Sequence, residues 1–266
     1  MIFESIFMIR GGHFGEEFSI KLFMALAALA ICLYDWKVND RLDYFWIFLI
    51  GSIIWTCVEI SLQLRGARVM QEKYFFGINI TNELWLTLPL QGMSEAAAIA
   101  IMGIFFGDRI MKRETRKTWL IIFGMFLSLF LLYLINGIHF NDVNVGGKVP
   151  SRREMFTLVA IIVIVILIAP AILLFVKSSS GRRRRGIYMF LVMTTFATFW
   201  TFMEWLVGQR WIEIGTVNPD GSYSNLRMAP PLIAIGALAF DIFIEIALLY
   251  VSFLAIAYFL RLIDEE

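Results

Sequence analysis

Five acidic residues lie inside long apolar stretches of this sequence: Glu59, Glu95, Glu204, Asp241 and Glu245. A carboxylate at the centre of a bilayer costs about 2.5–3.5 kcal/mol on insertion scales, so acids that remain there usually serve a function. Buried carboxyl groups can transfer protons or bind cations. These five residues are therefore the candidate catalytic groups.

The acids are predicted to share one depth in the membrane. Glu95 and Asp241 each lie about 11 residues, or roughly 16 Å of helix, from one end of their stretch, and Glu59 and Glu204 lie near the corresponding ends of theirs. All five are expected between the midplane and the outer leaflet. No Lys or Arg is expected at that depth, so several acids should be protonated or hold a cation. The structural alternative is that each acid only forms a hydrogen bond between helices.

A short internal repeat surrounds these acids. The segment Trp55–Glu59 (WTCVE) recurs at Trp200–Glu204 (WTFME), and an arginine follows each glutamate six residues later. In the next apolar stretch Gln91 and Glu95 match Asp241 and Glu245 in spacing. The candidate substrate-binding residues that follow from the repeat are Trp55, Thr56, Arg65, Gln91, Trp200, Thr201, Trp205 and Arg210.

The elements that must position these residues are membrane-spanning helices. Of 266 residues 59% are hydrophobic and 17% charged, whereas soluble domains average roughly 45–50% apolar and about 25% charged residues. A bilayer core of about 30 Å takes roughly 20 helical residues. Seven runs have about that length: Phe18–Trp36, Tyr44–Leu64, Leu84–Phe106, Trp119–Asn136, Met155–Val176, Ile187–Val207 and Pro231–Leu260. The sequence predicts an all-α integral membrane protein with seven transmembrane helices.

The repeat divides this single membrane domain, residues 1–266, into parts. Residues 1–17 are expected to lie at the membrane interface, 18–106 form a first three-helix repeat, 119–136 a linker helix, and 155–260 a second three-helix repeat. An odd number of intervening helices gives both halves the same orientation. The prediction is a 3+1+3 architecture with a pseudo-twofold axis along the membrane normal.

Positive residues predict the orientation of this multi-pass cell-membrane protein. Short connections after the first, third and fifth spans are rich in Lys and Arg, including the run Arg182–Arg185, so they should be cytoplasmic, with the N-terminus outside and the C-terminus inside. Between two spans such a run indicates topology and contact with anionic lipid rather than nucleic acid. The external loops should form β-hairpins over Arg210–Arg227, with a turn at Asn218–Gly221, and over Gly66–Trp85.

Metal and cofactor chemistry has little support in the sequence. Cys32 and Cys57 each lie within a span, and no Cys or His spacing typical of a zinc or iron–sulfur site occurs. We therefore expect no metal and no cofactor, with a cation bound by the carboxylate cluster left open.

The chain resembles a known family along part of this pattern. Trp55, Gly66, Tyr74–Gly77 (YFFG) and Leu88–Gln91 (LPLQ) are similar to the repeated unit of lycopene cyclase domains, and the membrane carotenoid hydratases look like a second relative. The resemblance implies seven helices, two three-helix repeats and glutamates that protonate a polyene. The family's Glu-Glu after the proline is Gln91-Gly92 here.

Three hypotheses about function remain. The first is a membrane-embedded acid–base enzyme, a lycopene cyclase-like lyase or isomerase, that acts on an isoprenoid, carotenoid or other lipid as cyclase, isomerase or hydratase. The second is a cation- or proton-coupled transporter whose carboxylates bind the ion. The third is a non-catalytic receptor or assembly subunit. The expected partners are a membrane lipid or an apolar isoprenoid, with homo-oligomers allowed and nucleic acid excluded.

Overall fold

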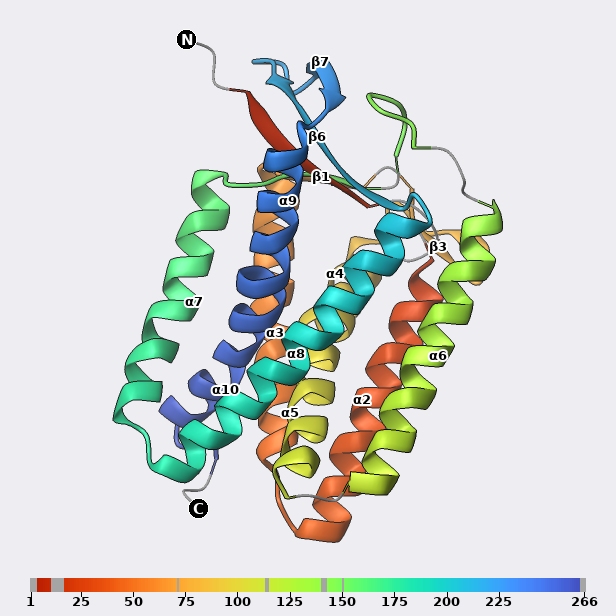
Figure 1. Cartoon of the computed structure of the whole chain (residues 1–266). Helices are drawn as coiled ribbons and strands as arrows, with labels where there is room; N and C mark the ends of the chain where they lie inside the picture. The colour runs from red at the N-terminus through yellow and green to blue at the C-terminus, as the bar shows by residue number, and fades with distance from the viewer. Residues whose placement is uncertain are drawn as a thin grey trace.

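The structure is a computed structural model that describes residues 4–10, 17–70, 72–112, 115–139, 143–149 and 151–263, with part of the side chains of the helix over 115–139. A bundle of long helices carries a β-sheet at one end, and the two chain termini lie at opposite ends of the bundle (Figure 1). The helical segments are α2 (Phe18–Asn39), α3 (Asp43–Leu64), α4 (Leu84–Gln91), η1 (Gly92–Ala97), α5 (Ala98–Met111), α6 (Thr115–His139), α7 (Leu158–Lys177), α8 (Ser180–Leu206), α9 (Pro231–Phe240), η2 (Asp241–Leu248) and α10 (Leu249–Phe259).

Among the described residues, six helical stretches are long and apolar enough to cross a membrane, which is the architecture of a multi-pass membrane protein. They coincide with six of the predicted spans. An apolar span is expected to be helical, because in lipid a backbone must satisfy its hydrogen bonds within the segment. The stretches Leu84–Met111 and Pro231–Phe259 each run through three consecutive helical segments. The predicted fourth span, 119–136, lies inside α6, and its crossing of the membrane remains a prediction.

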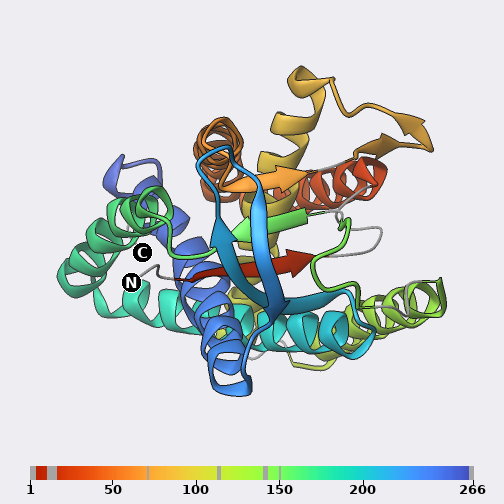
Figure 2. The same ribbon diagram turned by 90° about the horizontal axis from the view of Figure 1, so that it is seen from above.

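Of this sheet only the hairpin of its last two strands was predicted, so the all-α prediction holds only for the bundle. The strands are β1 (Ser5–Arg10), β2 (Arg68–Met70), β5 (Ser151–Glu154), β6 (Arg210–Val217) and β7 (Tyr223–Met228), in the order β2-β5-β1-β6-β7. Seen from above, the sheet crosses the end of the bundle (Figure 2). Its strands come from four distant parts of the chain, and the first is in the segment that we expected at the membrane interface. Residues 11–16 of that segment lie outside the described residues.

The strand register places four arginines on the face of the sheet that is turned toward the bundle. Arg68 of β2 lies opposite Arg153 of β5, and Arg10 of β1 lies opposite Arg210 of β6. Side chains alternate between the two faces of a strand. The neighbouring Arg152 therefore lies on the other face, where it pairs with Glu213.

Both predicted hairpins are present. β6 and β7 pair antiparallel on either side of the predicted turn, where Gly221 adopts a left-handed conformation with φ 81°. In the shorter loop β3 (Tyr74–Phe75) pairs with β4 (Ile78–Asn79), and Gly77 has φ 77°. Glycine is favoured at both positions because it has no Cβ.

Helix α3 and segment η1 approach each other closely at Gly92. A Cβ added there would lie 2.2 Å from Thr56 Oγ1 and 2.7 Å from the Ser52 carbonyl oxygen. This contact fixes the depth of η1, and so of Glu95, against α3.

We expect Gly92→Ala to destabilise the protein by about 1–3 kcal/mol, since the backbone must shift to admit the methyl group. The matched control is Gly236→Ala in α9, where an added Cβ meets nothing within 4 Å and alanine favours the helix by up to about 1 kcal/mol. Thermal unfolding in detergent measures both variants. Equal melting temperatures for the two would show that the contact at Gly92 does not constrain the fold.

Candidate functional site

The acids of the first half converge on one arginine from the sheet. Arg68 forms ion pairs with Glu59 of α3 and with Glu95 of η1, with a distance of 3.1 Å to Glu95. Lys21 of α2 donates a hydrogen bond to Gln91 and lies 3.3 Å from Glu95. Side chains from α2, α3, α4, η1 and β2 thus meet around Arg68 and Glu95.

The second half contains a similar arrangement. Arg210 of β6 lies 2.5 Å from Glu204 of α8 and 2.5 Å from Asp241 of η2. Arg210 also donates to Thr201 Oγ1 at 2.8 Å. Glu204 and Asp241 are 2% and 1% exposed, so these ion pairs are shielded from solvent.

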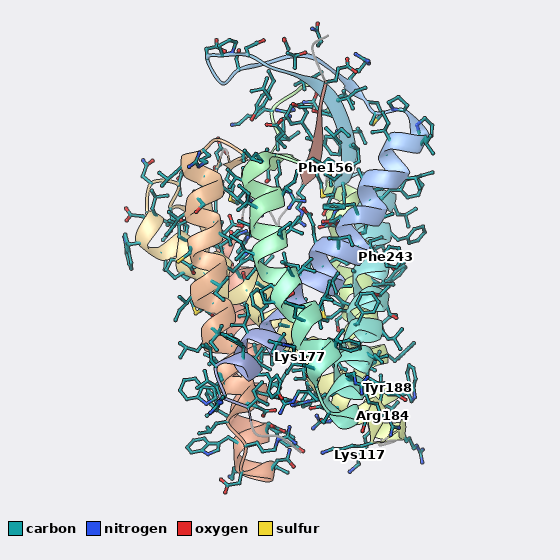
Figure 3. The ribbon with its side chains drawn as sticks, turned by 90° about the vertical axis from the view of Figure 1, so that its left-hand side faces the viewer. Lys117, Phe156, Lys177, Arg184, Tyr188 and Phe243 are labelled. Carbon is teal, nitrogen blue, oxygen red and sulfur yellow. The ribbon has the colours of Figure 1, made fainter. Side chains whose placement is uncertain are left out.

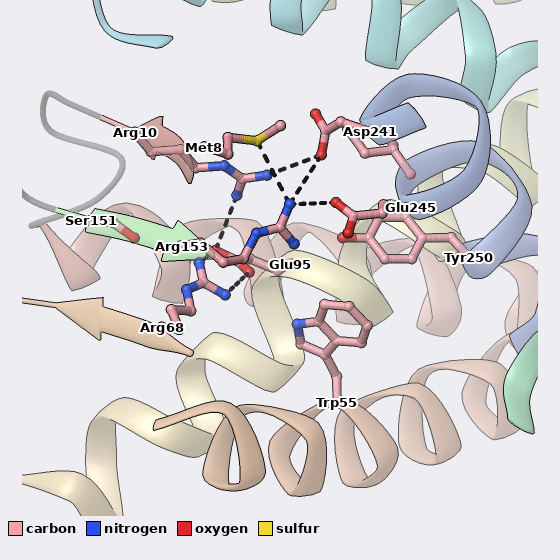
Figure 4. Close-up of a pocket in the computed structure, with 11 residues that line it drawn as sticks. Met8, Arg10, Trp55, Arg68, Glu95, Ser151, Arg153, Asp241, Glu245 and Tyr250 are labelled. Atoms are coloured by element: carbon pink, nitrogen blue, oxygen red, sulfur yellow. Dashed lines mark hydrogen bonds and ion pairs between the residues drawn. The ribbon is translucent and has the colours of Figure 1, made fainter. Parts of the chain in front are cut away.

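Two further arginines lie at the centre of the sheet, and one of them, Arg10, contacts acids of both halves. Arg10 lies 3.9 Å from Glu95 and 3.8 Å from Asp241. Arg153 pairs with Glu245 and lies 3.7 Å from Asp241. Figure 4 shows both guanidinium groups between the acids of η1 and η2. The expectation of one shared acid site therefore agrees with the geometry.

The expectation that no cation lies at this depth is wrong. The five acids contact five basic residues: Arg10, Lys21, Arg68, Arg153 and Arg210. Four of these side chains come from the sheet, whose strands lie outside the apolar spans. The fifth, Lys21 of α2, is 3% exposed. The charges balance, so the acids need neither protonation nor a bound cation to be neutralised.

The electrostatics of the sheet arginines support this balance. Burial by itself disfavours a charged guanidinium group. Nearby carboxylates outweigh that effect and raise the pKa of Arg10, with Asp241 as the strongest partner, and the pKa of Arg68, with Glu59 as the strongest partner. Both arginines therefore remain charged.

Two small cavities adjoin the cluster, with volumes of about 20 and 60 Å³. Such volumes hold a few water molecules. Glu95, Arg10, Arg68 and Tyr250 line both of them. The larger cavity extends toward α2 and α8, where Met24, Phe196 and Trp200 form its wall.

The wall of the smaller cavity presents an unused hydrogen-bond donor. Trp55 Nε1 is buried and has no hydrogen-bond partner among the described residues, and the same holds for Gln91 Nε2 next to Lys21. Trp55 lines the cavity together with Glu95, Asp241 and Glu245 (Figure 4). A ligand oxygen placed there would meet an indole N–H and three guanidinium groups, from Arg10, Arg68 and Arg153.

The structure separates the predicted substrate-binding residues into two groups. Trp55, Trp200 and Arg210 line the cavities, while Gln91 and Thr201 contact the basic residues of the cluster. The others lie elsewhere: Trp205 is 55% exposed, Arg65 caps α3 at an exposed position, and Thr56 donates its hydroxyl hydrogen bond to the Ser52 carbonyl.

Counting six residues from each glutamate matched Arg210 with Arg65, whereas the arginine of the first half that lies in the cluster is Arg68. Helix α3 runs three residues further past Glu59 than α8 runs past Glu204, so Arg65 is still at the end of its helix. Both helices are followed by a left-handed glycine, Gly66 with φ 66° and Gly208 with φ 70°, and in each case the arginine of the cluster comes two residues later. Alignment on Gly-x-Arg would have identified Arg68.

The central acids lie in π-helical segments. Glu95 is in η1, and Asp241 and Glu245 are in η2. π-Helical turns are rare and occur often at functional sites. Each widened turn interrupts a membrane-spanning stretch beneath the sheet arginines.

The interior below the cluster is filled with small and apolar side chains. Residues that are at most 1% exposed include Ala97 of η1, Ile101 and Ile104 of α5, Met193 of α8 and Phe253 of α10. Within the described part of the chain, no group of three or more His, Cys, Asp or Glu residues is arranged to hold a metal ion. No protein-family model, curated protein or solved structure matches this chain.

Arg68→Gln should destabilise the protein by about 3–5 kcal/mol, because it leaves Glu59 buried without its partner. The matched control, Arg65→Gln at the exposed end of α3, should have little effect. Adding Glu59→Gln to Arg68→Gln should restore part of the lost stability, since the uncompensated charge is removed. Thermal unfolding of the three variants measures this. If Arg68→Gln melts like Arg65→Gln, the ion pairs do not hold the sheet on the bundle.

Proposed function

We propose that the chain consists of two related halves, each with a strand, two helices, a second arginine-bearing strand and a π-interrupted helix, joined by α6. The strand register supports this. Exchanging Arg68 with Arg210 and Arg153 with Arg10 turns the pair Arg68–Arg153 into the pair Arg210–Arg10. The same exchange turns Met8–Arg153 into Ser151–Arg10. The axis that relates the halves passes between the antiparallel strands β1 and β5. Seven spans with the sheet and N-terminus outside fit this arrangement.

Topology can be tested with cysteine labelling in a variant that lacks Cys32 and Cys57. Ser222→Cys in the β6–β7 turn should react with a membrane-impermeant maleimide on intact cells. Lys117→Cys, near the start of α6 and at the opposite end of the bundle (Figure 3), should react only after permeabilisation. The reverse pattern would mean the opposite orientation. Labelling of both positions in intact cells would contradict the three membrane crossings, α6, α7 and α8, that the proposal places between them.

We propose that the site is that of a membrane-embedded acid–base enzyme acting on an isoprenoid or other lipid. One observation carries the proposal: Glu95, Asp241 and Glu245 face a single small cavity together with three guanidinium groups and the aromatic side chains of Trp55 and Tyr250. Buried carboxylates, aromatic faces and exclusion of bulk water are typical of proton-transfer sites in apolar surroundings. The closed apolar core beneath favours chemistry at this depth over passage through the bundle.

The pairing of acids with arginines indicates which type of proton transfer the site favours. Carboxylates that are paired with arginine remain ionised, so they are suited to remove a proton rather than to donate one first. Cations beside the cavity would oppose a carbocation and stabilise negative charge that develops on an oxygen. The arrangement therefore favours proton abstraction next to a carbonyl group over direct protonation of a polyene.

The proposed step is a double-bond shift. A carboxylate, Glu95 or one of the pair Asp241 and Glu245, removes a proton from the carbon next to a carbonyl, and the electrons of that C–H bond form an enolate. Trp55 Nε1 and the guanidinium groups donate hydrogen bonds to the enolate oxygen. In a substrate with a double bond between its β- and γ-carbons this enolate is a dienolate, and the same carboxyl group then returns the proton to the γ-carbon. The double bond moves next to the carbonyl, which completes an isomerisation without an external reactant.

Proton exchange into a lipid ketone tests the enzyme directly. The full-length protein in liposomes should exchange the α-hydrogens of the isoprenoid ketone geranylacetone for deuterium in D₂O, as measured by mass spectrometry. Glu95→Gln and Asp241→Asn should reduce the rate by at least about 100-fold, with the exposed Glu83→Gln as a control that retains wild-type exchange. Lycopene in the same assay tests the polyene class. Unchanged exchange in the variants would reject the assigned roles.

A second candidate is a cation- or proton-coupled transporter, and one observation favours it. At the end of the bundle away from the sheet, Arg185 of α8 forms bidentate hydrogen bonds with Asp108 of α5, at 2.8 and 2.7 Å, and lies 2.7 Å from Asp43 of α3. Ion pairs at both ends of a closed core are also what an occluded transporter would show. Uptake of ²²Na⁺ or proton-driven acidification in proteoliposomes, without ketone exchange, would favour transport.

A further inference from the structure

A further cavity lies at the opposite end of the bundle from the acid cluster and is almost wholly apolar. It is a groove of about 290 Å³ between α7, α8 and α10. Phe175 of α7, Phe190 of α8 and Val251 of α10 are among its lining residues. It shares no lining residue with the two cavities at the acid cluster.

The groove is placed to meet lipid. Only 17% of the most apolar stretch of α7 is buried, so most of this helix faces its surroundings. Leu173 and Val176 of α7 are 62% and 67% exposed, and Ile187 of α8, which lines the groove, is 48% exposed. Gly186, also in the lining, has no side chain and leaves room beside Phe175.

One end of the groove is positively charged. Arg182 lines it, with its guanidinium carbon 3.7 Å from the ring centre of Tyr258, a cation–π arrangement that holds the charge beside the apolar wall. The described lining residues include no acid. Lys177 and Arg184 lie at the same end of the bundle, away from the sheet (Figure 3). Arg185 has a different role, since its guanidinium pairs with Asp108 and Asp43.

We propose that this groove binds an anionic phospholipid, with an acyl chain along α7 and α10 and the phosphate on Arg182. An apolar slot that ends at a basic side chain near a membrane surface is complementary to such a molecule in both shape and charge. Basic residues near the surface each contribute about 1 kcal/mol to attraction of anionic lipid. The site is independent of the acid–base function proposed above.

Native mass spectrometry of the full-length protein in neutral detergent tests the proposal, with phosphatidylglycerol and phosphatidylcholine supplied at equal concentration. The wild type should retain more phosphatidylglycerol, and Arg182→Gln should reduce that retention about fivefold, which corresponds to about 1 kcal/mol. Arg184→Gln, whose side chain is outside the groove lining, is the charge-matched control and should remain close to the wild type. Ala255→Phe, which fills the groove, should reduce retention while the melting temperature shows that the protein is folded.

Several outcomes would overturn the assignment. Equal retention of the two lipids would remove the role of charge, and equal loss in Arg182→Gln and Arg184→Gln would reduce it to a general surface attraction. Competition by glycerol 3-phosphate as effective as that of the intact lipid would show a site for free phosphate without a role for the groove.

Discussion

The fold depends on the neutralisation of buried carboxylates by arginines that reach down from the sheet. Isolated charges inside a membrane protein are strongly unfavourable, and a buried pair is tolerated only with good geometry and further hydrogen bonds. Here Arg68 and Arg210 each bridge two helices of one half, so the sheet and the bundle cannot separate without exposing unpaired acids. The ion pairs that hold the sheet on the bundle are therefore also the ion pairs of the candidate site.

That constraint also shapes the chemistry. Glu95 contacts Arg68, Arg10 and Lys21. Asp241 contacts Arg210, Arg153 and Arg10, whereas Glu245 contacts Arg153. The acids of η1 and η2 thus have similar but not identical partners. Gln91 stands where the second half has Asp241, and Lys21 replaces a sheet arginine as its partner. The two sides of the cavity therefore differ in the basic residues that contact their acids.

The two ends of the bundle differ in the same terms. Near the sheet, charges face inward and are buried beneath the β-strands. At the other end, Arg185 is drawn into ion pairs between helices, while its neighbour Arg182 lies beside an apolar groove open to the surroundings. Neighbouring residues in one basic run thus serve different purposes, one in holding helices together and one at the lipid-facing surface.

The sequence by itself determined six of the helices, the common level of the acids along the bundle and the two hairpins, because hydrophobic length, helix rise and turn residues are local properties. Only the tertiary structure decided the partners of those acids. Strands of three to six residues, such as β2 and β1, carry too little periodicity to be recognised. The pairing of β1 with β5 joins residues about 150 positions apart in the chain, as in Phe7 with Glu154. Long-range pairing of this kind, which brings Arg10 and Arg153 over the bundle, leaves no signal in local composition.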